Sequence, residues 1–364
     1  MIELETLGPL VPGPAAAGVE CLTANNNLDL IRFDERLYLV WRTAPTHFAS
    51  ADARLEVSSA PSVGGPWRHE TTVALGADVR EPRFVADGRR LTVFFMQLGT
   101  NPRRFQPQGI HRIVTEGDGW SAPEVAIDAP VVPWRIRRLG GRWVLIGYRN
   151  AEKMYSVRPT DPVIELHWSD DLENWDAPVD LHDGGTECEL VELPDGRVLG
   201  LTRNEGPTRR GGDLIMATDV SVLQDAPLHR VSVTPIDRKL DSPNLFVWNG
   251  EPFVIARRQV AHGGRYDVVP GRTPGPLAIR VDQLVWWLSR KRSALYRLDP
   301  DRPSVAWELD LPSRGDTSFA AVVPEPDGTL LVADYTSSER RGDVMWLRGQ
   351  LGPTEIHLHR LSHH

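Results

Sequence analysis

The sequence predicts an all-β protein, a β-propeller with six blades, and three observations lead to this fold class. One unit recurs six times along the 364 residues: an apolar strand-like run, a tight turn and a second strand-like run. The second residue of each turn falls at positions 35, 88, 141, 196, 250 and 328, so four of the five steps span 53 to 55 residues. A second pair of strand-like runs follows the hairpins, which gives the four strands of a propeller blade.

The chemistry of the turns supports the hairpins. In the clearest copy, residues 187–193 form the first run, Pro194-Asp195-Gly196 the turn and residues 197–203 the second run. Similar copies span residues 241–257 and 316–335, and weaker copies turn at 34–35, 87–88 and 140–141. Asp-Gly and Asn-Gly between alternating apolar runs indicate hairpins, because these residues tolerate the left-handed backbone of a type I′ turn.

The outer strands of the repeats are expected at residues 54–59 and 67–73, 163–169 and 175–181, and 284–288 and 305–311. The long last step contains residues 263–276, which are rich in Gly, Pro and Arg and are expected to form an inserted loop. No stretch shows sustained helical periodicity, so a helical solenoid is disfavoured. One domain, residues 1–364, divides into repeats near 20–75, 76–128, 129–182, 183–236, 237–312 and 313–362.

Composition and charge narrow the functional classes. The net charge of −8 argues against a nucleic-acid partner. No apolar run approaches the ~18 residues of a membrane helix, and the first residues lack the pattern of a secretory signal, so we expect a cytoplasmic location and no membrane partner. Two cysteines and scattered histidines have no metal-ligand spacing. We therefore expect neither a metal nor a cofactor, and the sequence leaves the oligomeric state open.

Polar residues gather where the inner strands start and end. In a blade the first strand starts, and the second ends, on the same face, so these positions are expected to ring one axial mouth. The starts are Asn27, Asp29, Glu81, Arg83, Trp134, Arg135, Glu187, Glu189, Asp241, Asn244, Asp316 and Ser318, and the ends are Arg42, Gln97, Arg149, Arg203, Arg257 and Tyr335. These charges could pair and close the channel, but a mouth lined with both signs and a Trp also suits a polyhydroxylated, anionic ligand.

One stretch resembles the sialidase-like propellers. Residues 186–196, followed by 199–204, look like the sialidase blade that carries a catalytic-centre Glu and then a substrate-carboxylate Arg, roles that this resemblance gives to Glu187 and Arg203. Residues 169–175 resemble a shortened Asp box, and they are also similar to an outer-strand turn of five-bladed glycosidase propellers, the alternative architecture. The family's Tyr nucleophile is missing, because the matching region reads Asp316-Thr317-Ser318-Phe319.

Without that Tyr, glycoside hydrolysis needs two carboxyl groups, one as acid and one as base or nucleophile. Glu187 is the first choice, and Asp29 and Asp241 come next. We expect Arg83, Arg203 and Arg257 to bind a carboxylate or hydroxyls, and Trp134 to stack on a sugar face. The remaining residues expected to bind substrate are Glu81, Asp316 and Tyr335.

Three functions remain open from the sequence: a hydrolase of a small or terminal, anionic glycoside, a sugar-binding propeller without catalysis, and a polysaccharide lyase. A lyase needs a His or Tyr base beside a charge-neutralising Arg, for which Tyr335 and Arg257 are available. A hydrolase should hold two carboxyl groups roughly 5–10 Å apart, whereas a binding protein should have its mouth carboxylates ion-paired. The sugar, the linkage and the stereochemical outcome are not determined by the sequence.

Overall fold

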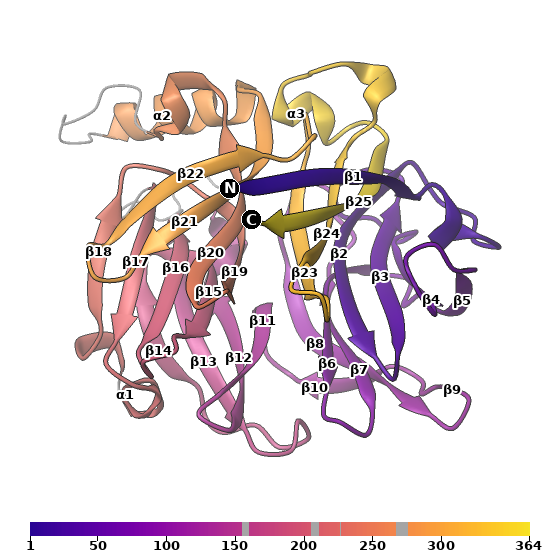
Figure 1. The fold of residues 1–364 in the computed structure, drawn as a ribbon, viewed down its shortest axis with the longest axis horizontal. Helices are drawn as coiled ribbons and strands as arrows, with labels where there is room; N and C mark the ends of the chain where they lie inside the picture. Colours follow the sequence, from indigo (N-terminus) through magenta and orange to yellow (C-terminus); the bar gives the residue numbers. More distant parts are fainter. Residues whose placement is uncertain (155–159, 205–210, 226, 267–275) are drawn as a thin grey trace. The chain divides into compact units, whose positions relative to one another are not determined.

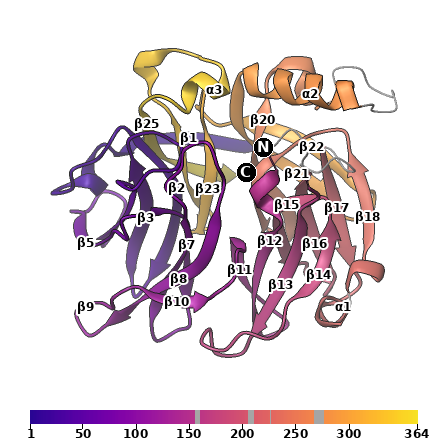
Figure 2. The same cartoon turned by 180° about the vertical axis from the view of Figure 1, so that it is seen from behind.

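The computed structural model describes residues 1–154, 160–204, 211–225, 227–266 and 276–364. Its strands form six antiparallel sheets (Figures 1 and 2). In five of these sheets, the four main strands lie side by side in the order of the sequence, and the sixth combines the first strand of the chain with the last three. The chain packs into two compact units. The first comprises residues 1–132, 316–342 and 348–364, and the second comprises residues 133–315 and 343–347.

The first unit holds three sheets. Their strands, in hydrogen-bonded order, are β2 (Ala24–Phe33), β3 (Arg36–Ala44), β4 (Arg54–Ala60) and β5 (Arg68–Val73); β6 (Asp78–Ala86), β7 (Leu91–Leu98), β8 (Pro107–Glu116) and β10 (Glu124–Ile127), with β9 (Gly119–Trp120) also on β8; and β23 (Ser318–Pro324), β24 (Leu330–Ser337), β25 (Thr354–His363) and β1 (Ile2–Val11). Short helical turns η1 (Pro14–Ala16) and η5 (Glu339–Arg341) lie between strands, and α3 (Trp346–Gly349) follows η5.

The second unit holds the other three sheets. Their strands are β11 (Val132–Leu139), β12 (Arg142–Arg149), β13 (Val163–Ser169) and β14 (Val179–Asp183); β15 (Gly185–Glu192), β16 (Val198–Asn204), β17 (Gly211–Ala217) and β18 (Ser232–Ile236); and β19 (Asp241–Trp248), β20 (Glu251–Gln259), β21 (Lys291–Asp299) and β22 (Ser304–Asp310). Its helical segments are η2 (Ala151–Lys153), α1 (Val220–Gln224), η3 (Pro227–His229), η4 (Ala261–Gly264) and α2 (Pro276–Leu288).

All six predicted inner hairpins are present, at β2–β3, β6–β7, β11–β12, β15–β16, β19–β20 and β23–β24. The turns have the backbone that their residues favour. Gly196 and Gly250 have φ of 87° and 81°, which a residue with a side chain adopts only under strain. The all-β class and the six-bladed β-propeller are confirmed, with one four-stranded sheet per blade and the small strand β9 added to one of them.

The last sheet takes its outermost strand from the start of the chain. Strand β1 pairs antiparallel with β25, from Ile2 opposite His363 to Val11 opposite Ile356. The predicted repeats begin near residue 20 and leave this strand out, although the alternation of Ile2, Leu4 and polar neighbours is a strand signal. Strands from both ends of the chain therefore complete one blade.

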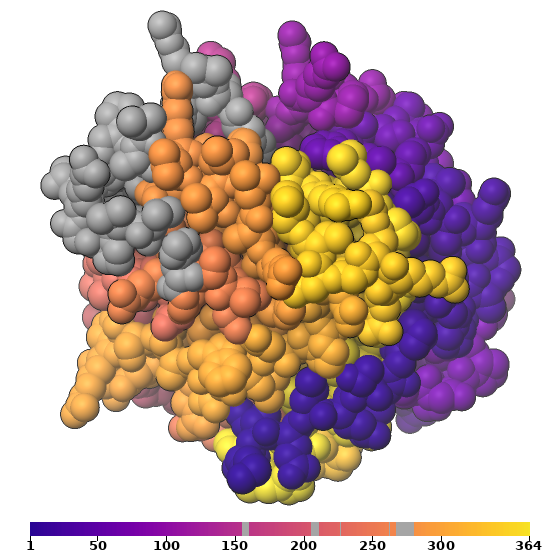
Figure 3. Space-filling model, turned by 90° about the horizontal axis from the view of Figure 1, so that it is seen from above, coloured from indigo at the N-terminus to yellow at the C-terminus, as the bar shows by residue number. Residues whose placement is uncertain are grey.

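Two predicted outer strands are corrected. Residues 284–288 belong to helix α2, and β21 takes the expected strand position. The run Leu-Val-Trp-Trp-Leu reads equally well as a strand or a helix, and here Trp286 is buried while Leu284 and Leu288 are about half exposed, as on an amphipathic helix (orange in Figure 3). Strand β14 begins at Val179, so most of the run predicted from Trp175 precedes it. Of the predicted loop 263–276, residues 267–275 lie outside the described part of the chain.

Apolar side chains fill the space between neighbouring sheets within each unit. In the first unit Val40, Leu55, Val79, Val93 and Ile113 form one such cluster with other residues of the first two sheets. In the second unit, the last two sheets share a cluster built from alternating residues of β16, β17, β19, β20 and β21. Among the described residues, no helix is long and apolar enough to cross a membrane.

Deleting residues 1–11 should lower the melting temperature and promote self-association. The deletion removes buried Leu10 and Val11 and leaves the edge of β25 unpaired, and an unpaired edge recruits other strands. Calorimetry and size-exclusion chromatography would measure both effects. A control variant, Glu3→Ala with Glu5→Ala, alters only exposed side chains of β1 and should melt like the wild type. An unchanged deletion variant would show that β1 adds nothing to stability.

Candidate functional site

The starts of the inner strands share an irregular backbone. In five inner hairpins the pairing register shifts close to the start of the first strand. A non-glycine residue with left-handed φ lies at each shift: Asn27 (43°), Glu81 (56°), Glu187 (43°), Ser242 (52°) and Phe319 (55°). Such β-bulges re-aim side chains, and the strained backbone must be held by its surroundings.

Residues beside these bulges lie directly opposite the ends of the second strands. Asn26 pairs with Arg42, Thr186 with Arg203, Asp241 with Arg257, and Ser318 with Tyr335. The predicted register, which places the start of one strand beside the end of the next, is therefore confirmed within each of these hairpins.

Polar contacts also join the starts of several inner strands to the equivalent positions of the next sheet. The pairs are Asn27 Nδ2 to Glu81 Oε1 (2.9 Å), Phe84 N to Asp29 Oδ2 (2.8 Å), Arg135 Nε to Glu189 Oε2 (2.6 Å) and Ser242 N to Glu187 Oε2 (2.7 Å). The partners are 54 or 55 residues apart, which is one repeat. We call these contacts the inter-blade latches, and they occur within both units.

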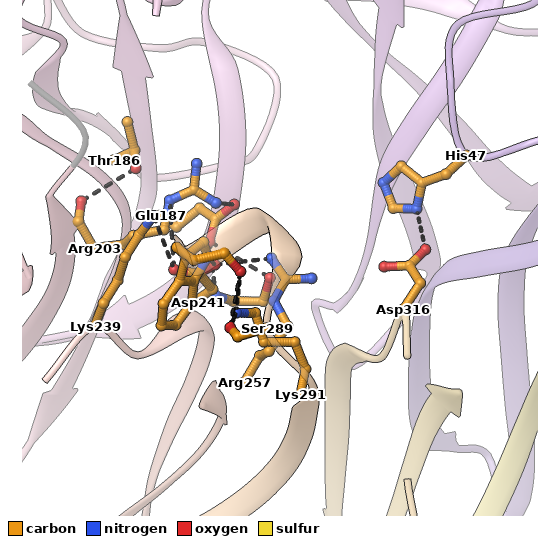
Figure 4. Close-up of polar contacts among 12 residues, drawn as sticks. His47, Thr186, Glu187, Arg203, Lys239, Asp241, Arg257, Ser289, Lys291 and Asp316 are labelled. Atoms are coloured by element: carbon orange, nitrogen blue, oxygen red, sulfur yellow. Dashed lines mark hydrogen bonds and ion pairs between the residues drawn. The ribbon is translucent and has the colours of Figure 1, made fainter. Parts of the chain in front are cut away.

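In the second unit, Glu187 lies at the centre of a buried charged cluster (Figure 4). Arg203 Nη1 donates to its Oε1 at 2.5 Å, while the Ser242 amide donates to its Oε2. Glu187 is only 6% exposed. Both of its oxygens thus accept hydrogen bonds, one of them from a cation.

Asp241, also in this cluster, lies within 4 Å of three cationic side chains. Arg257 Nη2 is 3.0 Å from its Oδ2, while Lys239 Nζ and Arg203 Nε are 3.8 and 3.9 Å from its Oδ1. The indole of Trp286 donates to Oδ2 at 3.2 Å. Burial opposes ionisation of this carboxyl group, but the surrounding cations outweigh it and hold the pKa of Asp241 well below its usual range.

Lys291 is fully buried behind Asp241. Its Nζ donates to Trp286 O at 2.5 Å and to Ser289 Oγ at 2.6 Å, and lies 3.6 Å from the centre of the Trp286 ring. Burial lowers the pKa of Lys291 to about 6, because the attraction of Asp241 only partly offsets the loss of hydration. Near neutral pH this lysine is mostly uncharged, so it acts as a hydrogen-bond donor that orders the strand–helix junction.

In the first unit, the predicted residues are held by different partners. Asp29 accepts from the amides of Leu30 and Phe84, and it is partly exposed. Arg83 donates to Glu81 at 3.5 Å, and its guanidinium lies 5.6 Å from the Phe319 ring. The hydroxyl of Tyr335 donates to Asp316 Oδ1 at 3.0 Å, and both side chains are fully buried.

The side chain of Trp134, which the sequence predicts to stack on a sugar, is buried. Trp134 is 1% exposed, its indole donates to Pro243 O at 3.3 Å, and Arg135 covers the ring at 5.3 Å. In this conformation the ring presents no face to a sugar.

The predicted site residues divide between the two units. Asp29, Glu81, Arg83, Asp316 and Tyr335 belong to the first, and Trp134, Glu187, Arg203, Asp241 and Arg257 belong to the second. The structure brings Glu187, Arg203, Asp241 and Arg257 together. That all ten residues line one mouth stays a prediction.

Three residues close to the predicted site residues were not predicted from the sequence: Lys239, Lys291 and His47. Lys239 and Lys291 in the second unit carry a detectable signal, since two of the chain's three lysines lie within the repeat that contains Asp241. His47, in the first unit, contacts Asp316 (Figure 4) and has no sequence signal, because its partner is 269 residues away.

The turn at residues 169–175 is held by its own side chains. Asp171 accepts from the amides of Asn174 and Glu173, and these bonds lower the pKa of Asp171. Ser169 Oγ accepts from the Leu172 amide at 2.9 Å. The assignment of residues 169–175 as an Asp box stays a prediction. No three His, Cys, Asp or Glu side chains in the described ranges are arranged to hold a metal ion.

No family model and no curated protein matches the sequence. Solved structures are similar to the chain in fold. A protein of unknown function from Dyadobacter fermentans DSM 18053 matches 99% of both chains with a TM-score of 0.65 and 13% identity. Trypanosoma rangeli sialidase, as a covalent intermediate with 2,3-difluorosialic acid, matches 99% of this chain with a TM-score of 0.63 and 11% identity. The phage phi92 endosialidase matches 100% of this chain and 70% of its own, with a TM-score of 0.60 and 11% identity.

These comparisons establish a sialidase-like propeller fold. This chain spans 58% of the length of the trypanosomal sialidase, so it corresponds to part of that protein. At identities of 11–13% the similarity concerns the fold, which is one that glycoside hydrolases use.

Lys291→Met should alter the pH dependence of stability. Lys291 releases its proton near pH 6 in the folded protein and near pH 10.5 when unfolded. Between these values the unfolded chain binds more protons, so the free energy of unfolding of the wild type rises with pH, by at most about 1.4 kcal/mol per unit. The stability of the variant relative to the wild type should therefore fall between pH 6.5 and 9.

Urea denaturation across this pH range would measure the difference. Lys153→Met, at an exposed position, is the matched control and should show a constant difference from the wild type. A constant difference for Lys291→Met as well would show that Lys291 stays charged when buried.

Proposed function

We propose that this protein is a glycoside hydrolase that acts on a small or terminal, anionic glycoside. The observation that carries the proposal is the cluster in which Glu187 and Asp241, at the bulged starts of adjacent sheets, meet Arg203, Arg257 and Lys239. Cationic side chains that converge on a site suit a carboxylate-bearing sugar. The fold shared with a sialidase and an endosialidase supports the same substrate class.

Glu187 is the proposed catalytic carboxylate. Because its two oxygens accept hydrogen bonds from Arg203 and from the Ser242 amide, it is arranged as an acceptor. That arrangement fits a base or nucleophile better than a proton donor. Its strained backbone, with φ of 43°, is the kind of feature that occurs at functional sites.

Asp241 has a different proposed role. A carboxyl group with a lowered pKa is ionised at neutral pH and cannot serve as the acid, so we assign Asp241 to holding Arg203 and Arg257 in position. Asp29, Glu81 and Asp316 remain the candidates for a second carboxyl group, with Arg83 as a substrate contact. Tyr335 does not suit the role of lyase base, because its hydroxyl is buried and already donates to Asp316.

A second candidate function, carbohydrate binding without catalysis, is favoured by one observation. Every carboxylate proposed for the site already has a polar partner: Glu187 has Arg203, Asp241 has Arg257, Glu81 has Asn27, Asp316 has His47, and Asp29 has the Phe84 amide. Three of them, Glu187, Asp241 and Glu81, form ion pairs with arginines, which is the pattern expected of a binding protein. The two candidates differ in whether Glu187 is needed for turnover.

Glu187→Gln should reduce turnover of a susceptible substrate by about 10²-fold or more, because an amide can act neither as base nor as nucleophile. Methylumbelliferyl sialosides and glucuronides, together with uronic-acid oligomers, are suitable probes. Glu192→Gln, on the same strand but exposed, is the matched control and should leave turnover unchanged.

The melting temperature of Glu187→Gln must be measured alongside its rate. If the role of Glu187 is purely structural, breaking its buried pair in Glu187→Gln should lower the free energy of unfolding by roughly 3–5 kcal/mol. The activity of the variant should then fall only in part. That outcome would contradict the catalytic role. Binding of the probes without turnover by the wild type would support the carbohydrate-binding candidate instead.

Arg257→Met should weaken binding of the same anionic sugars by about 10- to 100-fold, the cost of one charge-assisted hydrogen bond. Calorimetric titration with N-acetylneuraminate and with glucuronate would measure the dissociation constants. Neutral galactose is the control ligand, and its weak binding should not change. Equal affinities for the variant and the wild type would remove Arg257 from the binding site.

A further inference from the structure

His47 occupies a position that its surroundings fix closely. Its amide donates to Gln350 O at 3.1 Å, and Arg80 donates to its carbonyl oxygen at 3.1 Å. Arg42 donates to the carbonyl oxygens on either side, those of Thr46 (3.2 Å) and Phe48 (3.0 Å). Four main-chain hydrogen bonds therefore hold the segment that carries this one imidazole.

The two arginines that hold this segment are themselves anchored. Arg42 and Arg80 both bind the carboxylate of Asp78, and all three side chains are nearly or fully buried. This second layer of contacts is typical of a side chain that is positioned for function.

The imidazole itself is oriented by Asp316. Its Nδ1 lies 2.7 Å from Asp316 Oδ2, while Tyr335 donates to Oδ1 and the Asp316 amide donates to Ser337 Oγ at 2.9 Å. Since the short contact is with a carboxylate, Nδ1 carries the proton. The distance from Asn26 Nδ2 to His47 Nδ1 is longer, 3.2 Å. Arg42 orients the Asn26 amide by donating to its Oδ1.

The other ring nitrogen has no such partner. No described residue forms a hydrogen bond with Nε2 of His47, and the side chain is 15% exposed, whereas Asp316 is fully buried. A buried carboxylate that fixes the Nδ1 proton leaves the Nε2 lone pair available to accept one, as in general-base histidines of unrelated folds.

We propose that His47 and Asp316 form a proton-transfer centre in the first unit, where Nε2 of His47 accepts a proton from a hydroxyl group of a bound carbohydrate or from water. As the O–H bond breaks, the oxygen keeps the electron pair, the proton binds Nε2, and Asp316 stabilises the imidazolium. His47 can return the proton to a leaving oxygen in the reverse step. Asp316 is a positioning residue, and Tyr335 and Ser337 hold it. The inference goes beyond the hydrolase proposal, since it does not depend on Glu187.

Carbethoxylation by diethyl pyrocarbonate tests the centre without a substrate. An uncharged imidazole nitrogen attacks the reagent and forms N-carbethoxyhistidine, with release of carbon dioxide and ethanol. His69 is the internal control, because its side chain is 32% exposed and its Nε2 contacts a different carboxylate, that of Glu56 (3.0 Å), which Asp316→Asn leaves unchanged. Our proposal predicts that His47 reacts in the folded wild type and that its rate depends on Asp316, whereas the rate at His69 does not.

Site-resolved mass spectrometry of the intact folded protein would give both rates between pH 5 and 8. In Asp316→Asn the rate at His47 should fall by about tenfold, because the amide no longer fixes the proton on Nδ1 and so no longer keeps the Nε2 lone pair available. The rate at His69 should not change. An unreactive His47 in the wild type, or a rate at His47 that Asp316→Asn leaves unchanged, would overturn the proposal.

Turnover provides a second, separate readout. If the wild type hydrolyses a glycoside, His47→Gln should lower kcat by about 10²-fold with little change in KM, while His69→Gln should not. Equal kcat values for His47→Gln and the wild type would also overturn the proposal. If no glycoside is hydrolysed, the hydrolase proposal fails and the carbethoxylation rates alone decide the question of His47.

Discussion

Burial of charge at the starts of the inner strands is the constraint on which the rest of this structure depends. A buried, unpaired charge costs several kcal/mol, so each charged side chain that a bulge turns inward needs a partner. The chain meets this need across sheets: the inter-blade latches join Asn27 to Glu81, Arg135 to Glu189, and Glu187 to Ser242, one repeat apart. The same groups that could recognise a ligand therefore also hold neighbouring blades together.

Because the same residues connect sheets and belong to the candidate site, their contacts also set the chemistry around Asp241 and around His47. In the second unit, the cations around Asp241 keep it ionised, and burial removes the charge of Lys291. In the first unit, the pair of arginines on Asp78 fixes the main chain around His47, and Asp316 fixes its ring. Each group of contacts thus holds one hydrogen-bond acceptor in a fixed position, Glu187 in one and His47 in the other.

The fold was predictable because its strongest signals are local. Each inner hairpin has its turn residues and its alternating strands within about 20 residues of each other. Helix α2 could not be predicted, since an apolar run of five residues fits a strand as well as a helix. Strand β1 could not be predicted either, since its partner strand is at the other end of the chain. For the site, the Glu187–Arg203 pair lies within one hairpin and could be predicted, whereas the partners of His47 and Lys239 depend on how distant strands meet.

Closure of the last sheet by strands from both ends has a consequence for synthesis. The other five sheets are each built from consecutive strands and can form as the chain emerges from the ribosome, but β1 must wait unpaired until β25 has been made. During that interval a nascent chain carries an alternating, half-apolar strand with no partner.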